Sequence, residues 1–358
     1  MKIVLALALF ASASATLYTA EPKSQKYLWE SFKEEHHKDY STMEEETKRF
    51  HTFVENLKLI DERNKEEKNT AVHGITKFAD LSEGEFRKAY LNYKPDANKN
   101  RTKAEHIKPL KEGASVKQDW TGIYTTPVKD QGYCGSCWAF SATEQIESDY
   151  MREHGEEEIL SAQQVTSCTH YIFGGGCNGG FTENAFEYAE GGLELDSDYP
   201  YTSGNGKLFF RITSLSGVIK FALFNFILKI MSTQTAGVTG SCKASKTKYV
   251  VKTTGYTTVS SSEKDESTMA SYVGSTGPLS VCVDASRWST YTGGIMSTCG
   301  TSVDHCVQAV GIDTSAGYWK VRNSWGTSWG ESGFIRLEYG SNTCAIASDA
   351  NYATTEAY

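Results

Sequence analysis

The chain has 358 residues, of which 36 are basic and 44 are acidic, and 39% are hydrophobic. This composition excludes disordered and collagen-like chains, because it supplies enough apolar side chains for a core. With a net charge of -8, the chain lacks the excess of basic residues typical of nucleic-acid binders, so we expect no nucleic acid among the partners. At about 100 to 200 residues per domain, the length predicts two or three domain-sized units before processing.

The first 15 residues have the pattern of a secretory signal peptide. One Lys precedes an apolar run from Ile3 to Ala11, and Ala13-Ser14-Ala15 is a small-x-small cleavage pattern. The run is shorter than the ~20 residues that cross a membrane. We therefore expect a protein of the secretory pathway, in a lysosome-like vacuole or outside the cell, where disulfides are permitted.

A polar, helix-forming segment follows. Steps of three or four residues place six side chains along one predicted helix face. They are Glu45, Arg49, Phe53, Asn56, Ile60 and Asn64. An ordinary amphipathic surface helix has the same periodicity. The identities of the six residues, however, resemble the pattern in inhibitory propeptides of cathepsin L-like proteases, and the run from Gly74 to Asp80 resembles their second motif, with Thr76 where Asn is usual.

The strongest candidate for a catalytic motif is the run Cys134-Gly135-Ser136-Cys137-Trp138. A Cys-x-x-Cys spacing alone also occurs in redox motifs and zinc sites. Here the periodicity after Trp138 predicts an amphipathic helix, which places Cys137 at a helix N-terminus. The helix dipole and a neighbouring imidazolium would lower the pKa of such a thiol.

Two partners for this thiol lie far downstream. His305 is in a strand-like segment, and Asn323 begins the run Asn-Ser-Trp-Gly. A lone His or Asn is usually structural. Together with the Cys137 motif, they make the chain similar to papain-like cysteine proteases, over the propeptide and the mature region apart from one segment.

The resemblance implies an α+β, papain-like fold in which a helical domain, from about Val116 to Tyr199, packs on an antiparallel, barrel-like sheet domain, behind a helical inhibitory propeptide. The implied boundaries are 1–15 for the signal peptide, 16–112 for the propeptide and 113–358 for the peptidase domain. The implied catalytic roles are Cys137 as nucleophile, His305 as base, Asn323 as the group that orients the imidazole, and Gln131 as an oxyanion-hole donor. No metal or cofactor is expected.

Carried over residue by residue, the substrate-binding positions are Gly179, Gly180, Phe181, Cys282, Asp304, Cys306, Trp325 and Asp349. Trp325 would shield the bond between His305 and Asn323. In the pocket for the second residue before the scissile bond, Asp349 would form the floor. An acidic floor would accept Arg as well as Phe or Leu, because a buried guanidinium needs a carboxylate. The alternative is that Asp349 points outward as a solvated surface residue.

The resemblance also pairs cysteines: Cys134 with Cys177, Cys168 with Cys242, and Cys299 with Cys344. Cys137 is left as the free nucleophile. Cys282 and Cys306 remain unassigned, either as a fourth bridge or as two buried thiols.

Residues 207–237 do not fit the resemblance. The segment is rich in Phe and Ile and contains no acidic residue. Without it, the spacing from Cys137 to His305 falls within the roughly 130 to 150 residues typical of the family. Our hypothesis is translated intron sequence; the rival is a genuine apolar insertion.

We therefore expect a cysteine endopeptidase made as an inactive zymogen, which acts through a Cys-His-Asn thiolate and an acyl-enzyme. Expected partners are polypeptide substrates, the chain's own propeptide and cystatin-like inhibitors, with a monomeric state. Endopeptidase action is expected because no loop of the cathepsin B type is inserted. Two alternatives remain: a catalytically impaired binding or storage protein, and a thiol-disulfide oxidoreductase that uses Cys134 and Cys137.

Overall fold

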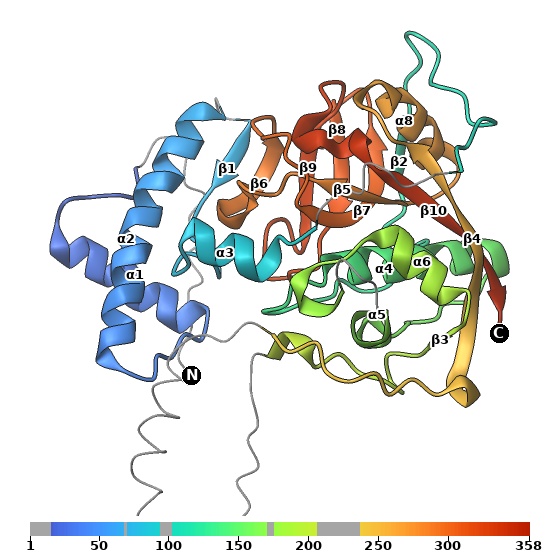
Figure 1. Cartoon of the computed structure of the whole chain (residues 1–358). Coiled ribbons are helices and arrows are strands. Elements are labelled where there is room, and N and C mark those ends of the chain that lie inside the picture. The colour runs from blue at the N-terminus through green and yellow to red at the C-terminus, as the bar shows by residue number, and fades with distance from the viewer. Residues whose placement is uncertain (1–15, 68–69, 94–101, 170–174, 206–236) are drawn as a thin grey trace, which may run out of the picture.

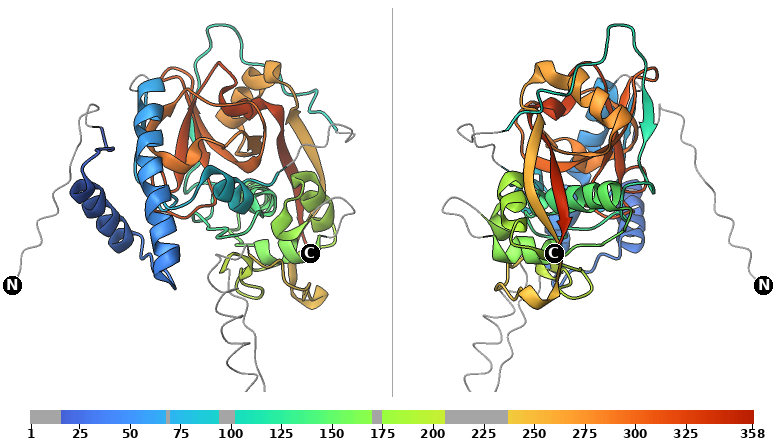
Figure 2. Two further views of the ribbon diagram at one scale, coloured as in Figure 1. Left: turned by 60° about the vertical axis from the view of Figure 1, so that its left-hand side comes forward. Right: turned by 90° about the vertical axis from the view of Figure 1, so that its right-hand side faces the viewer.

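The N-terminal part of the chain forms a helical unit that lies against one side of a larger, two-part body (Figure 1). The computed structural model describes residues 16–67, 70–93, 102–169, 175–205 and 237–358. The expected signal peptide and nearly all of the segment 207–237 lie outside these residues. Two further views show that the long helix α2 stands upright between α1 and the two-part body (Figure 2).

The N-terminal unit contains α1 (Pro22–Glu35), α2 (Met43–Glu66), β1 (Ala71–His73) and α3 (Glu83–Tyr90). Thr42 begins α2 by accepting a hydrogen bond from the backbone N–H of Glu45 at 3.1 Å, and Ser82 and Glu85 form a capping box on α3. Apolar side chains of α1 and α2 pack into a small core of their own, which includes Trp29, Phe32, Phe53, Leu57 and Ile60.

The predicted face of α2 binds the following chain segment rather than solvent. The Asn56 amide donates to the carbonyls of Ala79 and Leu81, both at 2.8 Å. The Asn64 amide exchanges two hydrogen bonds with the backbone of His73. The interpretation as an ordinary surface helix is therefore wrong, because polar members of the pattern hold the second motif in place.

The lower part of the body is helical and consists of α4 (Cys137–His154), α5 (Ala162–Cys168) and α6 (Thr182–Ala189). Helix α4 is buried along most of its length, because α5 and α6 cover one side and the sheet covers the other. Short 3-10 turns occur at Gly176–Asn178, Ser203–Asn205, Lys246–Lys248, Glu263–Asp265, Trp288–Thr290 and Thr343–Ser348.

The upper part is a sheet with one covering helix, α8 (Glu266–Ser275). Its strands are β2 (Lys117–Asp119), β3 (Leu193–Glu194), β4 (Tyr249–Ser260), β5 (Leu279–Val283), β6 (Tyr291–Met296), β7 (His305–Asp313), β8 (Tyr318–Arg322), β9 (Phe334–Glu338) and β10 (Ala350–Ala357). The order is β1-β6-β9-β8-β7-β5-β10-β4-β3, with β2 on β7. The pairs are antiparallel except β6 with β9.

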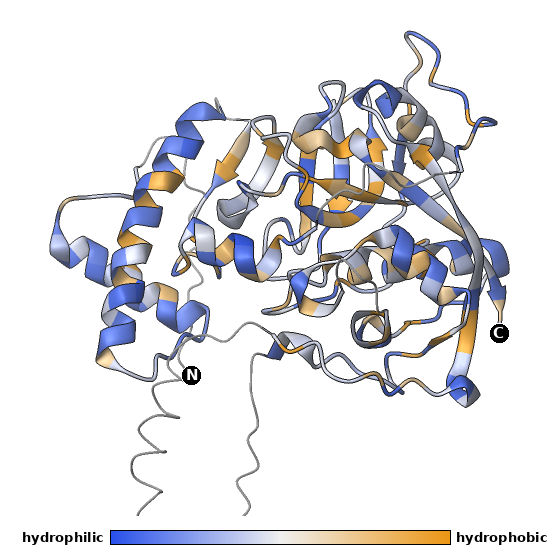
Figure 3. Ribbon diagram, viewed as in Figure 1, coloured by the Kyte–Doolittle hydropathy of each residue, from blue (hydrophilic) through white to orange (hydrophobic). Residues whose placement is uncertain are grey.

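The two-domain α+β class is confirmed, with two differences of detail. The described strands run from β1 to β3 without closing into a barrel. Strand β2 pairs with β7, so the start of the expected helical domain belongs to the sheet. Inner strands such as β5 and β7 are largely hydrophobic, whereas outward helix faces are polar (Figure 3). No helix within the described ranges combines the length and apolar character needed to cross a bilayer.

Candidate active site

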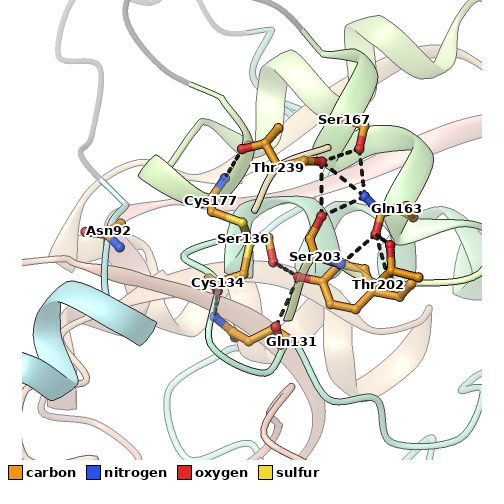
Figure 4. The surroundings of a disulfide bond; sticks show 12 residues. Asn92, Gln131, Cys134, Ser136, Gln163, Ser167, Cys177, Thr202, Ser203 and Thr239 are labelled. Carbon is orange, nitrogen blue, oxygen red and sulfur yellow. Dashed lines mark hydrogen bonds between the residues drawn. A yellow bond between two sulfur atoms is a disulfide. The ribbon is translucent and has the colours of Figure 1, made fainter. Parts of the chain in front are cut away.

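Cys137 is the first residue of α4 and is fully buried. The loop before it is fixed by the disulfide between Cys134 and Cys177 (Figure 4). The indole of Trp138 donates to the carbonyl of Gly176 at 3.2 Å, which ties the start of α4 to the same turn. The helix N-terminus expected for Cys137 is therefore present.

A polar network behind this disulfide holds the loop in place (Figure 4). The Gln163 amide donates to the hydroxyl of Ser203 at 2.7 Å and accepts from the backbone N–H groups of Thr202 and Ser203. The hydroxyl of Thr239 accepts from the backbone N–H of Cys177 at 3.0 Å. The chain segments before and after residues 206–236 therefore meet at this network beside the disulfide.

His305 begins β7 and faces Asn323, which follows β8. Nε2 of His305 lies 2.8 Å from Oδ1 of Asn323, and both side chains are fully buried. The imidazole stacks on the indole of Trp325 at a centroid distance of 4.8 Å. Among the described residues, Nδ1 of His305 has no hydrogen-bond partner, so it is the nitrogen available to a thiol proton.

Gln131 is held by contacts at both ends of its amide. Oε1 accepts from the hydroxyl of Ser324 at 2.8 Å, and Nε2 donates to the carbonyl of Cys134 at 2.9 Å. A longer contact of 3.4 Å joins Nε2 to the carbonyl of Tyr90, from the N-terminal unit. A donor of the kind needed to stabilise an oxyanion is therefore engaged by the chain's own backbone.

The N-terminal unit covers the site. Residues Leu91 to Tyr93 come directly after α3 in the sequence and lie against Cys137. The backbone N–H of Asn92 faces the thiol. A methyl group in place of the Gly179 hydrogen would lie 2.0 Å from the carbonyl oxygen of Asn92, so this close approach requires glycine. Arg87 pairs with Asp304 at 3.0 Å, beside His305.

Burial under this segment decides the charge state of the pair. It raises the pKa of the Cys137 thiol to about 12 and lowers the pKa of His305 to about 4. Burial also raises the pKa of Asp304 to about 6. The closed form therefore holds a neutral thiol and a neutral imidazole. This differs from the lowered thiol pKa expected at a helix N-terminus, because loss of hydration outweighs the backbone N–H groups.

The expected pocket residues come together around Tyr93. Its ring packs edge-on against Phe181 at a centroid distance of 6.2 Å and shares one buried cluster with Cys282 and Cys306. Its hydroxyl donates to Oδ2 of Asp349 at 2.6 Å. Asp349 is 2% exposed, so it is not the solvated surface residue of the alternative interpretation.

All nine cysteines lie in the described ranges, and eight of them form four disulfides. Three are the pairs implied by the resemblance: Cys134–Cys177, Cys168–Cys242 and Cys299–Cys344. The fourth joins Cys282 to Cys306, which lie directly opposite each other on β5 and β7. Cys137 is the free cysteine. Within the described ranges, no group of His, Cys, Asp and Glu side chains has the arrangement of a metal site.

A second contact between the N-terminal unit and the body lies at β1 and β6. The buried carboxylate of Glu67 accepts from the backbone N–H groups of Ser297 at 2.9 Å and Thr298 at 3.1 Å. Nδ1 of the buried His73 lies 2.8 Å from the hydroxyl of Thr290. Sequence reasoning missed these residues and Tyr93, because each acts across a long sequence separation and no periodicity marks it.

The Cys137 thiol is buried and faces the backbone N–H of Cys306, the residue after His305 of the His-Asn pair. A buried thiol near such a pair, covered by an N-terminal helical unit, is the arrangement of a cysteine protease zymogen. The family model described as papain family cysteine protease matches residues 114–354, and the cathepsin propeptide inhibitor domain matches residues 29–86. The chain belongs to the papain family of cysteine proteases and carries its own propeptide inhibitor.

Particular relatives share nearly the whole length. A cathepsin L-like proteinase of Phaedon cochleariae is 34% identical and covers 98% of this chain and 99% of its own. The probable cysteine protease RDL2 of Arabidopsis thaliana is also 34% identical, over 93% of this chain and 86% of its own. The solved structure of digestive procathepsin L 3 from Tenebrio molitor matches with a TM-score of 0.71 at 31% identity, over 92% of this chain and 99% of that chain.

Proposed function

We propose that the chain is a secretory-pathway cysteine endopeptidase whose catalytic groups are Cys137, His305, Asn323 and Gln131. The observation that carries this proposal is the contact between Nε2 of His305 and Asn323, which directs Nδ1 of the same ring away from Asn323. The sequence supports the compartment, since an apolar leader precedes the propeptide and four disulfides follow.

The reaction follows from these groups. Nδ1 of His305 takes the proton of Cys137, and the thiolate attacks the peptide carbonyl carbon. The negative charge that develops on the oxygen is stabilised by the Gln131 amide and the backbone N–H of Cys137. The imidazolium then protonates the leaving amine, and a thioester remains. Water, deprotonated by His305, hydrolyses that thioester and regenerates the thiol.

Release of the propeptide is the activating step in this proposal. It rehydrates the site and thereby removes the largest cause of the raised Cys137 pKa and the lowered His305 pKa. It also frees the Gln131 amide from Tyr90. We further propose a monomer in a lysosome-like vacuole or outside the cell, open to cystatin-like inhibitors that enter the same cleft.

The test is proteolysis by the full-length zymogen after acidification. We expect the wild type to shorten itself and then cut internal bonds of denatured protein, whereas Cys137→Ala stays at full length and cuts nothing. Release of dipeptides alone from chain ends would contradict endopeptidase action. Equal cleavage by Cys137→Ala would contradict the assignment of the nucleophile.

A further inference from the structure

Three buried polar side chains join α4 to the sheet. They are Glu144 of α4, Gln308 of β7 and Arg322, the last residue of β8, and we call them the interdomain cluster. None of the three is more than 1% exposed. Burying charged groups costs desolvation that apolar side chains of similar size avoid, so packing alone does not explain their presence.

The elements that supply the cluster also carry the catalytic groups. Helix α4 begins at Cys137, β7 begins at His305, and Asn323 directly follows Arg322. Glu144 lies about two helical turns beyond Cys137, on the same face of α4. Hydrogen bonds within the cluster therefore act on the position of the nucleophile relative to the His-Asn pair.

The guanidinium of Arg322 contacts three separate segments. Nη2 donates to Oε1 of Gln308 at 2.7 Å, and Nη1 donates to the carbonyl of Thr126 at 2.6 Å and to its hydroxyl at 3.2 Å. Nε lies 3.5 Å from Oε2 of Glu144. One planar side chain thus links β8 to β7, to α4 and to the segment that precedes α4.

The amide of Gln308 continues this link onto α4. While Oε1 accepts from Arg322, Nε2 faces three acceptors on the helix. These are the carbonyl of Glu144 at 3.2 Å, Oε1 of Gln145 at 3.1 Å and the hydroxyl of Ser148 at 2.9 Å. Both ends of this amide are therefore fixed, and β7 is held in register with α4.

The ion pair in the cluster weakens in acid. Burial raises the pKa of Glu144 to about 7; Arg322 and Lys129 oppose this rise, and Glu147 adds to it. Below that pH the carboxyl of Glu144 is neutral, so neutral acceptors alone hold Arg322. The fork of hydrogen bonds, rather than the positive charge, is therefore what fixes Arg322 under acidic conditions.

We propose that Arg322 is a positioning residue for catalysis, which holds the His-Asn pair in register with Cys137 through its hydrogen bonds to Gln308 and Thr126. The proposal rests on the proposed function of the site. A small displacement of a reacting group costs up to about 100-fold in rate even when its cause lies outside the site. The loss should appear in kcat, because Arg322 is buried away from the substrate.

The test compares Arg322→Lys and Gln308→Leu with the wild type, as processed enzymes obtained from the full-length zymogen. Arg322→Lys keeps the charge and removes the fork, whereas Gln308→Leu keeps the volume and removes the amide. We expect kcat per titrated active site to fall about 10- to 100-fold in each variant, with little change in KM. Arg336→Lys is the matched control, because Arg336 lies on the neighbouring strand β9 and pairs with Glu331 instead.

A second readout separates positioning from a purely structural role. It is the pH dependence of alkylation of Cys137 by iodoacetamide. Its midpoint should move to higher pH in Arg322→Lys and Gln308→Leu, because a displaced imidazolium stabilises the thiolate less. The midpoint in Arg336→Lys should equal that of the wild type.

Wild-type kcat and an unshifted midpoint in folded Arg322→Lys would overturn the proposal, and so would equal losses in Arg336→Lys. Thermal unfolding checks that each variant is folded at the assay temperature. If Arg322→Lys does not fold, Gln308→Leu decides the question by the same two measurements.

Failure of the two proposals is separable. A wild type that cuts peptides and reacts at Cys137, together with variants that keep its kcat, overturns the positioning role alone. A wild type that neither cuts nor reacts at Cys137 overturns the proposed function and, with it, this inference.

Discussion

Nε2 of His305 lies 2.8 Å from Oδ1 of Asn323, under the indole of Trp325. This contact fixes the plane of the imidazole and requires the proton on Nε2, which leaves Nδ1 as the proton acceptor. The pair joins the first residue of β7 to the residue after β8, and neighbouring strands therefore set its geometry.

Asn323→Ala should lower kcat about 100-fold with little change in KM, because the imidazole loses its orientation while the substrate contacts remain. Steady-state kinetics on one peptide check this, with thermal unfolding as the control for folding. A loss that appears only in KM would contradict an orienting role for Asn323.

Gln131→Ala should lower kcat about 100- to 1,000-fold, since the variant loses a donor to the developing oxyanion. Ser324→Ala removes the hydroxyl that fixes the Gln131 amide, and should cost less than Gln131→Ala. If both variants retained wild-type kcat, the donor would have to lie elsewhere in the cleft.

Acid should loosen the propeptide through His73. In the docked form, burial lowers the pKa of His73 from 6.5. The charges of Arg63 and Arg287 lower it further, whereas Glu67 opposes the shift without cancelling it. The released form therefore binds more protons, so docking is favoured above about pH 6.5 and weakens as the pH falls below it. The pKa of Glu67 is also lowered in the docked form, from 4.5, so protonation of Glu67 weakens docking further below about pH 4.5.

His73→Gln cannot take up this proton, so the midpoint of self-processing should move to lower pH. His51→Gln is the matched control, because His51 is exposed on α2. The measurement is the pH dependence of the processing rate. A midpoint shared by the wild type and His73→Gln would rule out His73 as the proton-binding group.

Removal of residues 207–236 should leave the fold intact. The flanking chain is already closed, because the backbone N–H of Val238 donates to the carbonyl of Ser203 at 3.1 Å. We expect the free energy of unfolding to change by less than about 1 kcal/mol. A deletion variant that fails to fold would contradict this expectation.

Gln163→Ala breaks the hydrogen-bond network that holds Thr202 and Ser203. It should lower the free energy of unfolding by about 1 to 3 kcal/mol.

The sequence predicted what local patterns encode. The steps from Glu45 to Asn64 gave the α2 face, and the apolar spacing after Trp138 gave a helix that starts at Cys137. It left the bridge between Cys282 and Cys306 open, and it did not predict the parallel pairing of β6 and β9 or the contact of Tyr93 with Asp349. These depend on tertiary contacts between distant segments, for which no local spacing exists.

The pKa of the Cys137 thiol likewise depends on tertiary contacts that the sequence does not reveal. Sequence motifs indicate a helix N-terminus and a nearby imidazole, whereas the burial that raises the pKa of the thiol to about 12 depends on tertiary packing around Cys137. In the function proposed above, Cys137 is unreactive while the propeptide is docked and becomes reactive once the propeptide leaves.

Labelling of Cys137 by a thiolate-directed epoxide, read by peptide mass spectrometry, tests the central claim most directly. We predict one label per processed molecule, located on Cys137, almost none on the intact zymogen at the same pH, and none on processed material from Cys137→Ala obtained with added protease. Label on another residue of the processed enzyme, or equal labelling of zymogen and processed enzyme, would contradict a propeptide-masked Cys137 nucleophile.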